Sequence, residues 1–124
     1  MSTHSSAFLQ LVDQARQNIK EIDIETMLAM KASGESFVLV DVREQDEWAA
    51  GHLPDAVYIG KGVIERDIQA KYPDPQTTLV LYCGGGFRSA LAADNLVKMG
   101  YQNAINMDGG YRRWTDLGHP VVKG

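Results

Sequence analysis

Cysteine, long apolar runs and clustered positive charge are all scarce in this sequence of 124 residues. The single cysteine, Cys83, excludes an intramolecular disulfide, and a lone thiol is typical of a reducing compartment. No apolar run approaches the roughly 20 residues that span a bilayer, and residues 1–6 lack the basic segment and apolar run of a secretory signal. We therefore expect a cytoplasmic protein that does not insert into a membrane.

The charge balance narrows the classes of partner. The chain has 16 acidic and 12 basic side chains, a net charge of −4, and no basic run, which disfavours nucleic acid and anionic membrane surfaces. No acid or second cysteine stands at ligand spacing to any of the three histidines, so we predict neither a metal site nor a cofactor. The remaining composition is ordinary for one globular domain.

Strand-like and helix-like segments alternate along the chain. Residues 37–42 and 77–82 are too continuously apolar for half-exposed strands, which favours the interior of a sheet covered on both faces. The pattern predicts an α/β fold, a three-layer α/β/α domain around a mainly parallel five-stranded sheet. Further strands are expected at 19–22, 56–59 and 103–107, and helices at 7–17, 24–31, 44–50, 63–71, 89–99 and 111–114.

Helical spacing also predicts which faces pack. We expect residues 1–18 to form an accessory N-terminal helix beside a domain at 19–124. We also expect the helix at 89–99 to pack on the sheet. The expected packing positions are Phe8, Leu11, Val12, Ala15 and Ile19 in the first helix, and Leu91, Ala92, Asn95, Leu96 and Met99 in the later one.

A glycine-rich loop follows the strand at 77–82 and begins with Cys83. Glycines let the backbone turn sharply and point several N–H groups inward, and the start of a helix adds the positive end of its dipole. The same environment lowers a thiol pKa. We interpret Cys83 as a nucleophile inside an anion cradle formed by Gly84, Gly85, Gly86, Phe87, Arg88 and Ser89.

A simpler interpretation is that Cys83 is a small buried hydrophobe at the end of a strand, as most free cysteines are. A structural cysteine requires neither the glycine triplet nor Arg88, which favours the nucleophile.

Asp41 and Arg43 end another central strand, at the edge where open parallel sheets place their ligands. Capping of the next turn by Asp41, and pairing of Arg43 with a nearby acid, is favoured over direct chemistry. Either role would support the site. His52 is expected to be a hydrogen-bonded turn residue rather than a base.

Four segments, taken in order, resemble the single-domain rhodanese family over about residues 19–122. They are 39–44 (Leu-Val-Asp-Val-Arg-Glu), 47–56 (Glu-Trp-Ala-Ala-Gly-His-Leu-Pro-Asp-Ala), 82–89 (Tyr-Cys-Gly-Gly-Gly-Phe-Arg-Ser) and 107–114 (Met-Asp-Gly-Gly-Tyr-Arg-Arg-Trp). The resemblance implies a sulfurtransferase in which Cys83 takes sulfane sulfur from a donor such as thiosulfate. The persulfide then passes its sulfur to cyanide, a small thiol or a protein acceptor.

One departure from the family pattern concerns the two positions after the cysteine. Some thiosulfate-using rhodaneses carry a cationic side chain there, whereas this chain has Gly84 and Gly85, leaving Arg88 as the only cation of the loop. A persulfide relay between partner proteins therefore stays open.

Two further alternatives share the fold. One is a noncatalytic interaction module, which would need to keep neither Cys83 nor the glycines. The other is a phosphatase or arsenate reductase, whose loops place five residues between cysteine and arginine. Only four separate Cys83 from Arg88.

Overall fold

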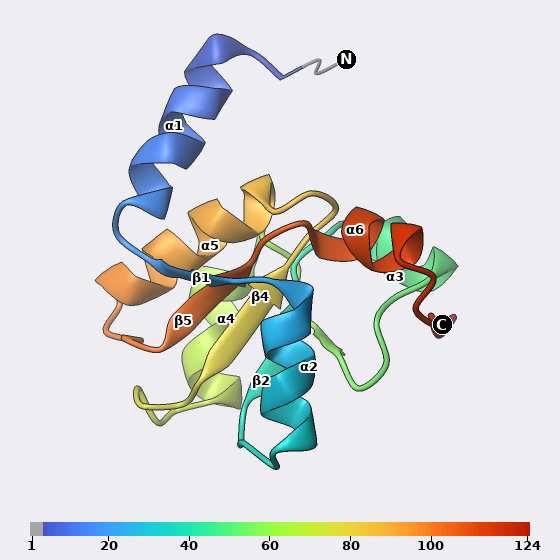
Figure 1. The fold of residues 1–124 in the computed structure, drawn as a ribbon. Coiled ribbons are helices and arrows are strands. Elements are labelled where there is room, and N and C mark those ends of the chain that lie inside the picture. The colour runs from blue at the N-terminus through green and yellow to red at the C-terminus, as the bar shows by residue number, and fades with distance from the viewer. Residues whose placement is uncertain (1–3) are drawn as a thin grey trace.

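A parallel five-stranded sheet runs through the middle of the structure, a computed structural model in which residues 4–124 are described (Figure 1). The strand order is β1-β5-β4-β2-β3, and every pairing is parallel. The predicted α/β class and strand number are thus confirmed, with an entirely parallel sheet. The strands are β1 (Lys20–Ile22), β2 (Val38–Asp41), β3 (Val57–Tyr58), β4 (Leu79–Tyr82) and β5 (Ala104–Met107).

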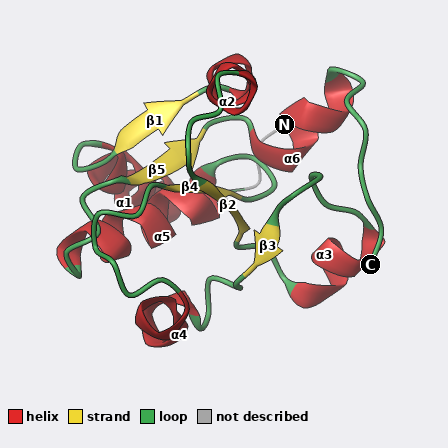
Figure 2. Ribbon diagram, turned by 90° about the horizontal axis from the view of Figure 1, so that it is seen from below, coloured by secondary structure: helices red, strands yellow, loops and turns green. Residues whose placement is uncertain are grey.

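Helices cover both faces of this sheet, which gives the expected three layers (Figure 2). One face carries α1 (Ser6–Arg16), α4 (Ile64–Lys71) and α5 (Phe87–Lys98), and the other carries α2 (Ile24–Ala32) and α6 (Gly110–Asp116). The short helix α3 (Gln45–Ala50) lies beyond the edge formed by β3. Within residues 4–124, no helix combines the length and the apolar character needed to cross a membrane.

The position of β4 in the middle of the sheet explains why this strand is apolar at every position. Leu79 and Leu81 pack into the core under α4 and α5, whereas Val80 and Tyr82 pack into the core under α2 and α6. All four side chains are buried, because a parallel sheet between two helical layers offers no solvent-facing side. Cys83, the next residue, is therefore held at the carboxyl end of the most enclosed strand.

The N-terminal helix packs along α5, as its buried residues Val12 and Ala15 show. Ser5 caps it by accepting a hydrogen bond from the Phe8 amide at 3.1 Å. The expectation for Leu11 was wrong, since this side chain is 53% exposed. The contact with α5 centres on Val12 and Ala15, which leaves Leu11 at its margin. Residues 1–3 of the expected N-terminal segment lie outside the described part of the chain.

The expected packing of Met99 was also wrong. Helix α5 begins at Phe87, two residues earlier than expected, and ends at Lys98, so Met99 is its C-cap and is 43% exposed. Gly100 then turns the chain with a φ of +108°, a left-handed conformation that glycine adopts without steric cost. Met99 therefore lies past the end of the packed helix.

Candidate active site

The thiol of Cys83 lies at the start of the loop between β4 and α5 and is almost fully buried. Its Sγ accepts a hydrogen bond from the Gly86 amide at 3.1 Å. Gly86 caps α5 with a φ of +99°, a backbone conformation that favours glycine, and a Cβ there would make a tight contact of 3.2 Å with the Asp108 carboxylate. The loop thus bends back until an amide from the helix N-terminus reaches the sulfur.

The beginning of α6 fixes which way this loop faces. The Tyr111 amide donates to the Cys83 carbonyl at 2.8 Å, and the Arg112 amide donates to the Gly84 carbonyl at 2.9 Å. A Cβ on Gly110 would collide with the same Cys83 carbonyl oxygen. Because α6 takes the loop carbonyls, the loop amides are left to face the thiol and an incoming anion.

Hydrogen bonding and burial act in opposite directions on the thiol. Burial raises the pKa of Cys83, but hydrogen bonds from the Ser89 side chain and from the amides of Ser89, Gly86 and Gly85 lower it more. The net effect holds the Cys83 pKa below its ordinary value. More of the nucleophilic thiolate is therefore present at neutral pH than a free cysteine would provide.

Ser89 connects the thiol to a buried polar chain. Its Oγ lies 3.4 Å from Cys83 Sγ and 2.6 Å from Asn106 Oδ1. The Asn106 amide group donates to the Gly86 carbonyl at 3.1 Å and to the Glu21 carboxylate at 2.8 Å, which orients its Oδ1 toward Ser89. A hydroxyl has one proton, so the two acceptors Asn106 and Cys83 compete for it. Sequence reasoning missed Asn106 and Glu21, which lie on β5 and β1.

Arg88, the cation expected in the loop, forms an ion pair with a carboxylate of the protein. Its guanidinium donates two hydrogen bonds to the Glu47 carboxylate, at 2.7 and 3.1 Å. This pair raises the pKa of Arg88, and the bond from Arg88 is the main cause of the lowered pKa of Glu47. Glu47 comes from α3, so Arg88 already has a partner within the protein.

A cavity of about 360 Å³ opens over the thiol. A second guanidinium reaches it: Arg112 Nη1 lies 4.0 Å from the position that a Cβ would take on Gly85. Arg88 is the only cationic residue within the loop sequence, and Arg112 of α6 is a second cationic residue that lines the cavity. The residues lining the cavity are His4, Phe8, Cys83, Gly84, Gly85, Phe87, Arg88 and Arg112.

Asp41 and Arg43 form a buried pair behind the loop. The Asp41 carboxylate accepts bonds from the Arg43 amide at 2.9 Å, from its guanidinium at 2.8 Å, and from the Tyr82 hydroxyl at 2.7 Å. Arg43 also donates to the Gly51 carbonyl at 2.6 Å. The cluster fastens the end of β2 to Tyr82, the residue directly before Cys83. Neither Asp41 nor Arg43 lines the cavity over the thiol.

His52 is engaged away from this cavity. Its Nδ1 lies 3.2 Å from the Trp48 carbonyl oxygen, and its ring stacks on the Trp48 ring with centroids 3.5 Å apart. Its backbone also bridges to Val122. These contacts suit a residue that ties the turn to the C-terminal segment.

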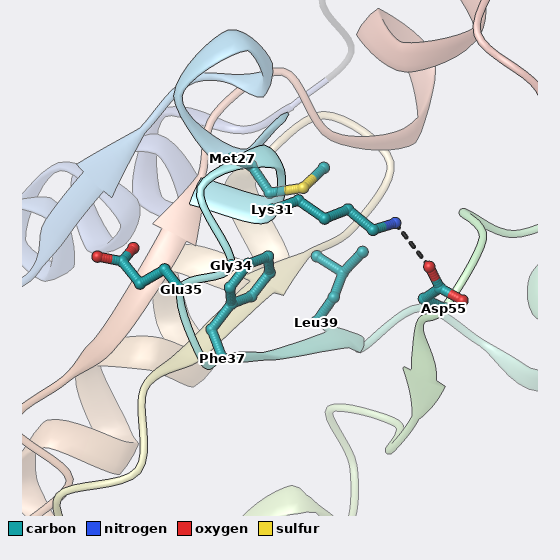
Figure 3. Close-up of a pocket in the computed structure, with 7 residues that line it drawn as sticks. All are labelled: Met27, Lys31, Gly34, Glu35, Phe37, Leu39 and Asp55. Atoms are coloured by element: carbon teal, nitrogen blue, oxygen red, sulfur yellow. Dashed lines mark ion pairs between the residues drawn. The ribbon is translucent and has the colours of Figure 1, made fainter. Parts of the chain in front are cut away.

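A separate apolar pocket of about 190 Å³ lies between α2 and the start of β2 (Figure 3). Met27, Phe37 and Leu39 line it, and an ion pair of 2.7 Å between Lys31 and Asp55 closes one side. Its lining contains no cysteine, and it shares no residue with the cavity over Cys83. In the part of the chain that the structure describes, no group of three or more His, Cys, Asp or Glu side chains is arranged to hold a metal ion.

Comparison with known proteins shows the family of this chain. Residues 23–117 match the model of the rhodanese-like domain. A sulfurtransferase of Allochromatium vinosum is 34% identical over 84% of this chain and 95% of its own length. The thiosulfate sulfurtransferase GlpE of Pseudomonas entomophila is 35% identical over 77% of this chain and 84% of its own length. The chain spans only 52% of a further curated relative, YrkF of Bacillus subtilis.

A solved structure resembles the whole described chain, including α1. It is a protein of unknown function from Rhodopseudomonas palustris, described as a possible tyrosine phosphatase, with a TM-score of 0.80, 30% identity and 98% coverage of both chains. Because the family model matches residues 23–117 and the Allochromatium relative is 34% identical over 84% of the chain, the chain belongs to the rhodanese-like sulfurtransferase family.

Proposed function

We propose that the protein moves sulfane sulfur from a small donor to a thiol or cyanide acceptor through a persulfide on Cys83. The observation that carries the proposal is the buried Cys83 thiol with a lowered pKa, bonded by the Gly86 amide beneath an open cavity. Its relatives in Allochromatium and Pseudomonas are named sulfurtransferases. Cys83 also lies in segment 82–89, one of the four segments whose sequence resembles the rhodanese family.

The proposed reaction has two displacement steps, and both take place at the sulfur atom that is transferred. The Cys83 thiolate attacks the outer sulfur of thiosulfate, the S–S bond of the donor breaks, and sulfite leaves with the bonding electrons. A cyanide ion or thiolate then attacks the outer sulfur of the Cys83 persulfide, and its S–S bond breaks to restore the thiolate. The loop amides stabilise negative charge at the sulfur in both steps without any proton transfer.

With no second cysteine in the sequence, the persulfide cannot be resolved within one chain. The sulfur must leave to an external acceptor, either a small molecule or the thiol of a partner protein. A relay of this kind is the second form of the proposal, favoured by the pairing of Arg88 with Glu47, which reduces the positive charge available to a dianionic donor.

A turnover assay separates these activities from hydrolysis of a phosphate ester. We expect the reduced protein to form thiocyanate from cyanide and a sulfane-sulfur donor, and Cys83→Ser to lose that activity. The exposed Ser33→Ala variant serves as the matched control and keeps it. Hydrolysis of an aryl phosphate that depends on Cys83, with no sulfur transfer to cyanide or a thiol, would replace this proposal with a phosphatase.

A further inference from the structure

The N-terminal helix supplies one wall of the cavity over Cys83. Phe8 of α1 and His4, just before the helix, both line that cavity together with Phe87. All of α1 precedes residue 23, where the match to the rhodanese-like domain begins. The wall is therefore an addition to the part of the chain that the family defines.

Aromatic contacts make this wall a continuous surface. The Phe8 and Phe87 rings meet edge to face with centroids 6.2 Å apart. The His4 ring lies 5.2 Å from Phe8 and 4.9 Å from Phe87. Such geometries are favourable for aromatic pairs, so the three rings support one another.

Helix α1 is also attached close to the loop at its other end. The Arg16 guanidinium lies 5.3 Å from the centroid of the Phe87 ring, in a cation–π contact. It also pairs with Glu21 and Asp108, each at 3.4 Å. Together with the buried contacts of Val12 and Ala15, these bonds hold α1 against α5. The aromatic wall thus has a fixed position relative to Cys83.

The lining of the cavity is chemically mixed. Besides the rings it includes the glycine amides and two guanidiniums, those of Arg88 and Arg112. At about 360 Å³ the cavity has room for a small organic molecule in addition to the reacting sulfur. Thiosulfate is small and fully polar, and would leave the aromatic surface uncovered. A molecule that carries an anionic sulfur next to an apolar group would use both kinds of lining.

We propose that Phe8 and His4, with Phe87, determine donor specificity by favouring organic sulfane-sulfur compounds with an apolar substituent over thiosulfate. This inference rests on the proposed sulfurtransferase function and names the donor class for the same site. With benzenethiosulfonate as the probe, the Cys83 thiolate attacks the terminal sulfur, the S–S bond breaks, and benzenesulfinate leaves with the electron pair. Thiosulfate offers the same sulfur with a negatively charged oxygen in place of the phenyl ring.

The test measures kcat/KM for persulfide formation with both donors in the full chain. We expect the wild-type protein to favour benzenethiosulfonate, and Phe8→Ala to reduce that preference about fivefold to tenfold, the value of one lost aromatic contact. Leu11→Ala is the matched control on the same helix, because its side chain points into solvent, and we expect an unchanged preference. Phe8→Leu, which keeps the helix and most of the apolar volume, should give an intermediate value if Phe8→Ala fails to fold.

The failures of the two proposals look different. If neither donor yields a persulfide on the wild-type protein, the sulfurtransferase proposal itself is wrong. If both donors react but the preference is absent, or survives in both Phe8 variants, the aromatic wall does not select the donor, and only the specificity inference is overturned.

Discussion

Arg88 on α5, which lines the cavity over Cys83, and Glu47 on α3 form a bidentate ion pair with contacts of 2.7 and 3.1 Å. Each side chain is about one third exposed, at 33% and 34%. The pair joins the loop around Cys83 to the segment that follows β2. It also means that the main cation of the loop is already partly neutralised before any donor arrives.

This pairing predicts that Glu47→Gln strengthens the use of thiosulfate. Removing the carboxylate charge leaves Arg88 positive beside the loop, and exposed charge effects of this kind are worth about 0.2–1 kcal/mol, or up to about fivefold in rate. We therefore expect kcat/KM for thiosulfate to rise in Glu47→Gln and to fall in Arg88→Ala. Asp46→Asn, at the neighbouring exposed carboxylate of α3, is the control. A loss in Glu47→Gln as large as that in Arg88→Ala would show that Glu47 acts by positioning the guanidinium.

The Ser89 hydroxyl gives a prediction about the thiol. Its hydrogen bond is the largest of the contributions that lower the pKa of Cys83. Ser89→Ala removes it, so the pKa should rise and less thiolate should be present at neutral pH. We expect slower alkylation of Cys83 by iodoacetamide at pH ~7, with the pH profile moved to higher pH. An unmoved profile would mean that the backbone amides alone set the thiol pKa.

Asn106→Ala is expected to move the same profile the other way. Without its Oδ1, the single Ser89 proton no longer has a competing acceptor and is donated to Cys83 Sγ, which favours the thiolate. The variant also leaves the buried Gly86 carbonyl without its donor, which costs about 1–3 kcal/mol of stability. Denaturant unfolding therefore accompanies the alkylation measurement, and a profile that moves upward would contradict the competition for the proton.

The contact between Gly110 and the Cys83 carbonyl predicts a loss of both stability and reactivity. Gly110→Ala places a methyl group against that carbonyl at a φ of +55°, so the loop and α6 must separate. The matched control is Gly118→Ala, whose φ of +81° carries the same backbone cost of about 1–2 kcal/mol but whose added methyl group meets open space. We expect Gly110→Ala to lose more unfolding free energy than the control and to be alkylated more slowly at Cys83. Equal behaviour of the two variants would mean that the close approach is unimportant.

The buried pair of Asp41 and Arg43 predicts a large effect on stability. Asp41→Asn leaves the Arg43 charge buried without its counterion, which typically costs about 3–5 kcal/mol. Asp55→Asn, which breaks the exposed pair with Lys31, should cost less than about 1 kcal/mol. Urea unfolding of both variants measures the difference. Similar midpoints for the two would show that the buried pair does not hold the end of β2 in place.

The parts of this architecture that the sequence predicts are those with a local signal. The apolar run of β4 and the three glycines after Cys83 stand next to one another in the chain, so a buried strand followed by an anion-binding loop can be predicted directly. The class of fold follows from the alternation of such segments.

The missed residues come from segments that are distant in the sequence. Glu47 and Arg88 are 41 positions apart, and Ser89 and Asn106 are 17 apart. Neither pairing has a spacing rule, because each depends on how helices and strands are placed in three dimensions. Helical periodicity predicts that Phe8 belongs to a packing face. It does not reveal that the same side chain also borders the cavity over Cys83.

Intact mass spectrometry of the reduced protein after incubation with thiosulfate or benzenethiosulfonate tests the central claim most directly. We predict that the wild-type protein gains the mass of one sulfur atom, that a thiol reductant or cyanide reverses the gain, and that Cys83→Ser shows no gain. An unmodified wild-type mass with both donors, or the same gain in Cys83→Ser, would contradict a persulfide on Cys83.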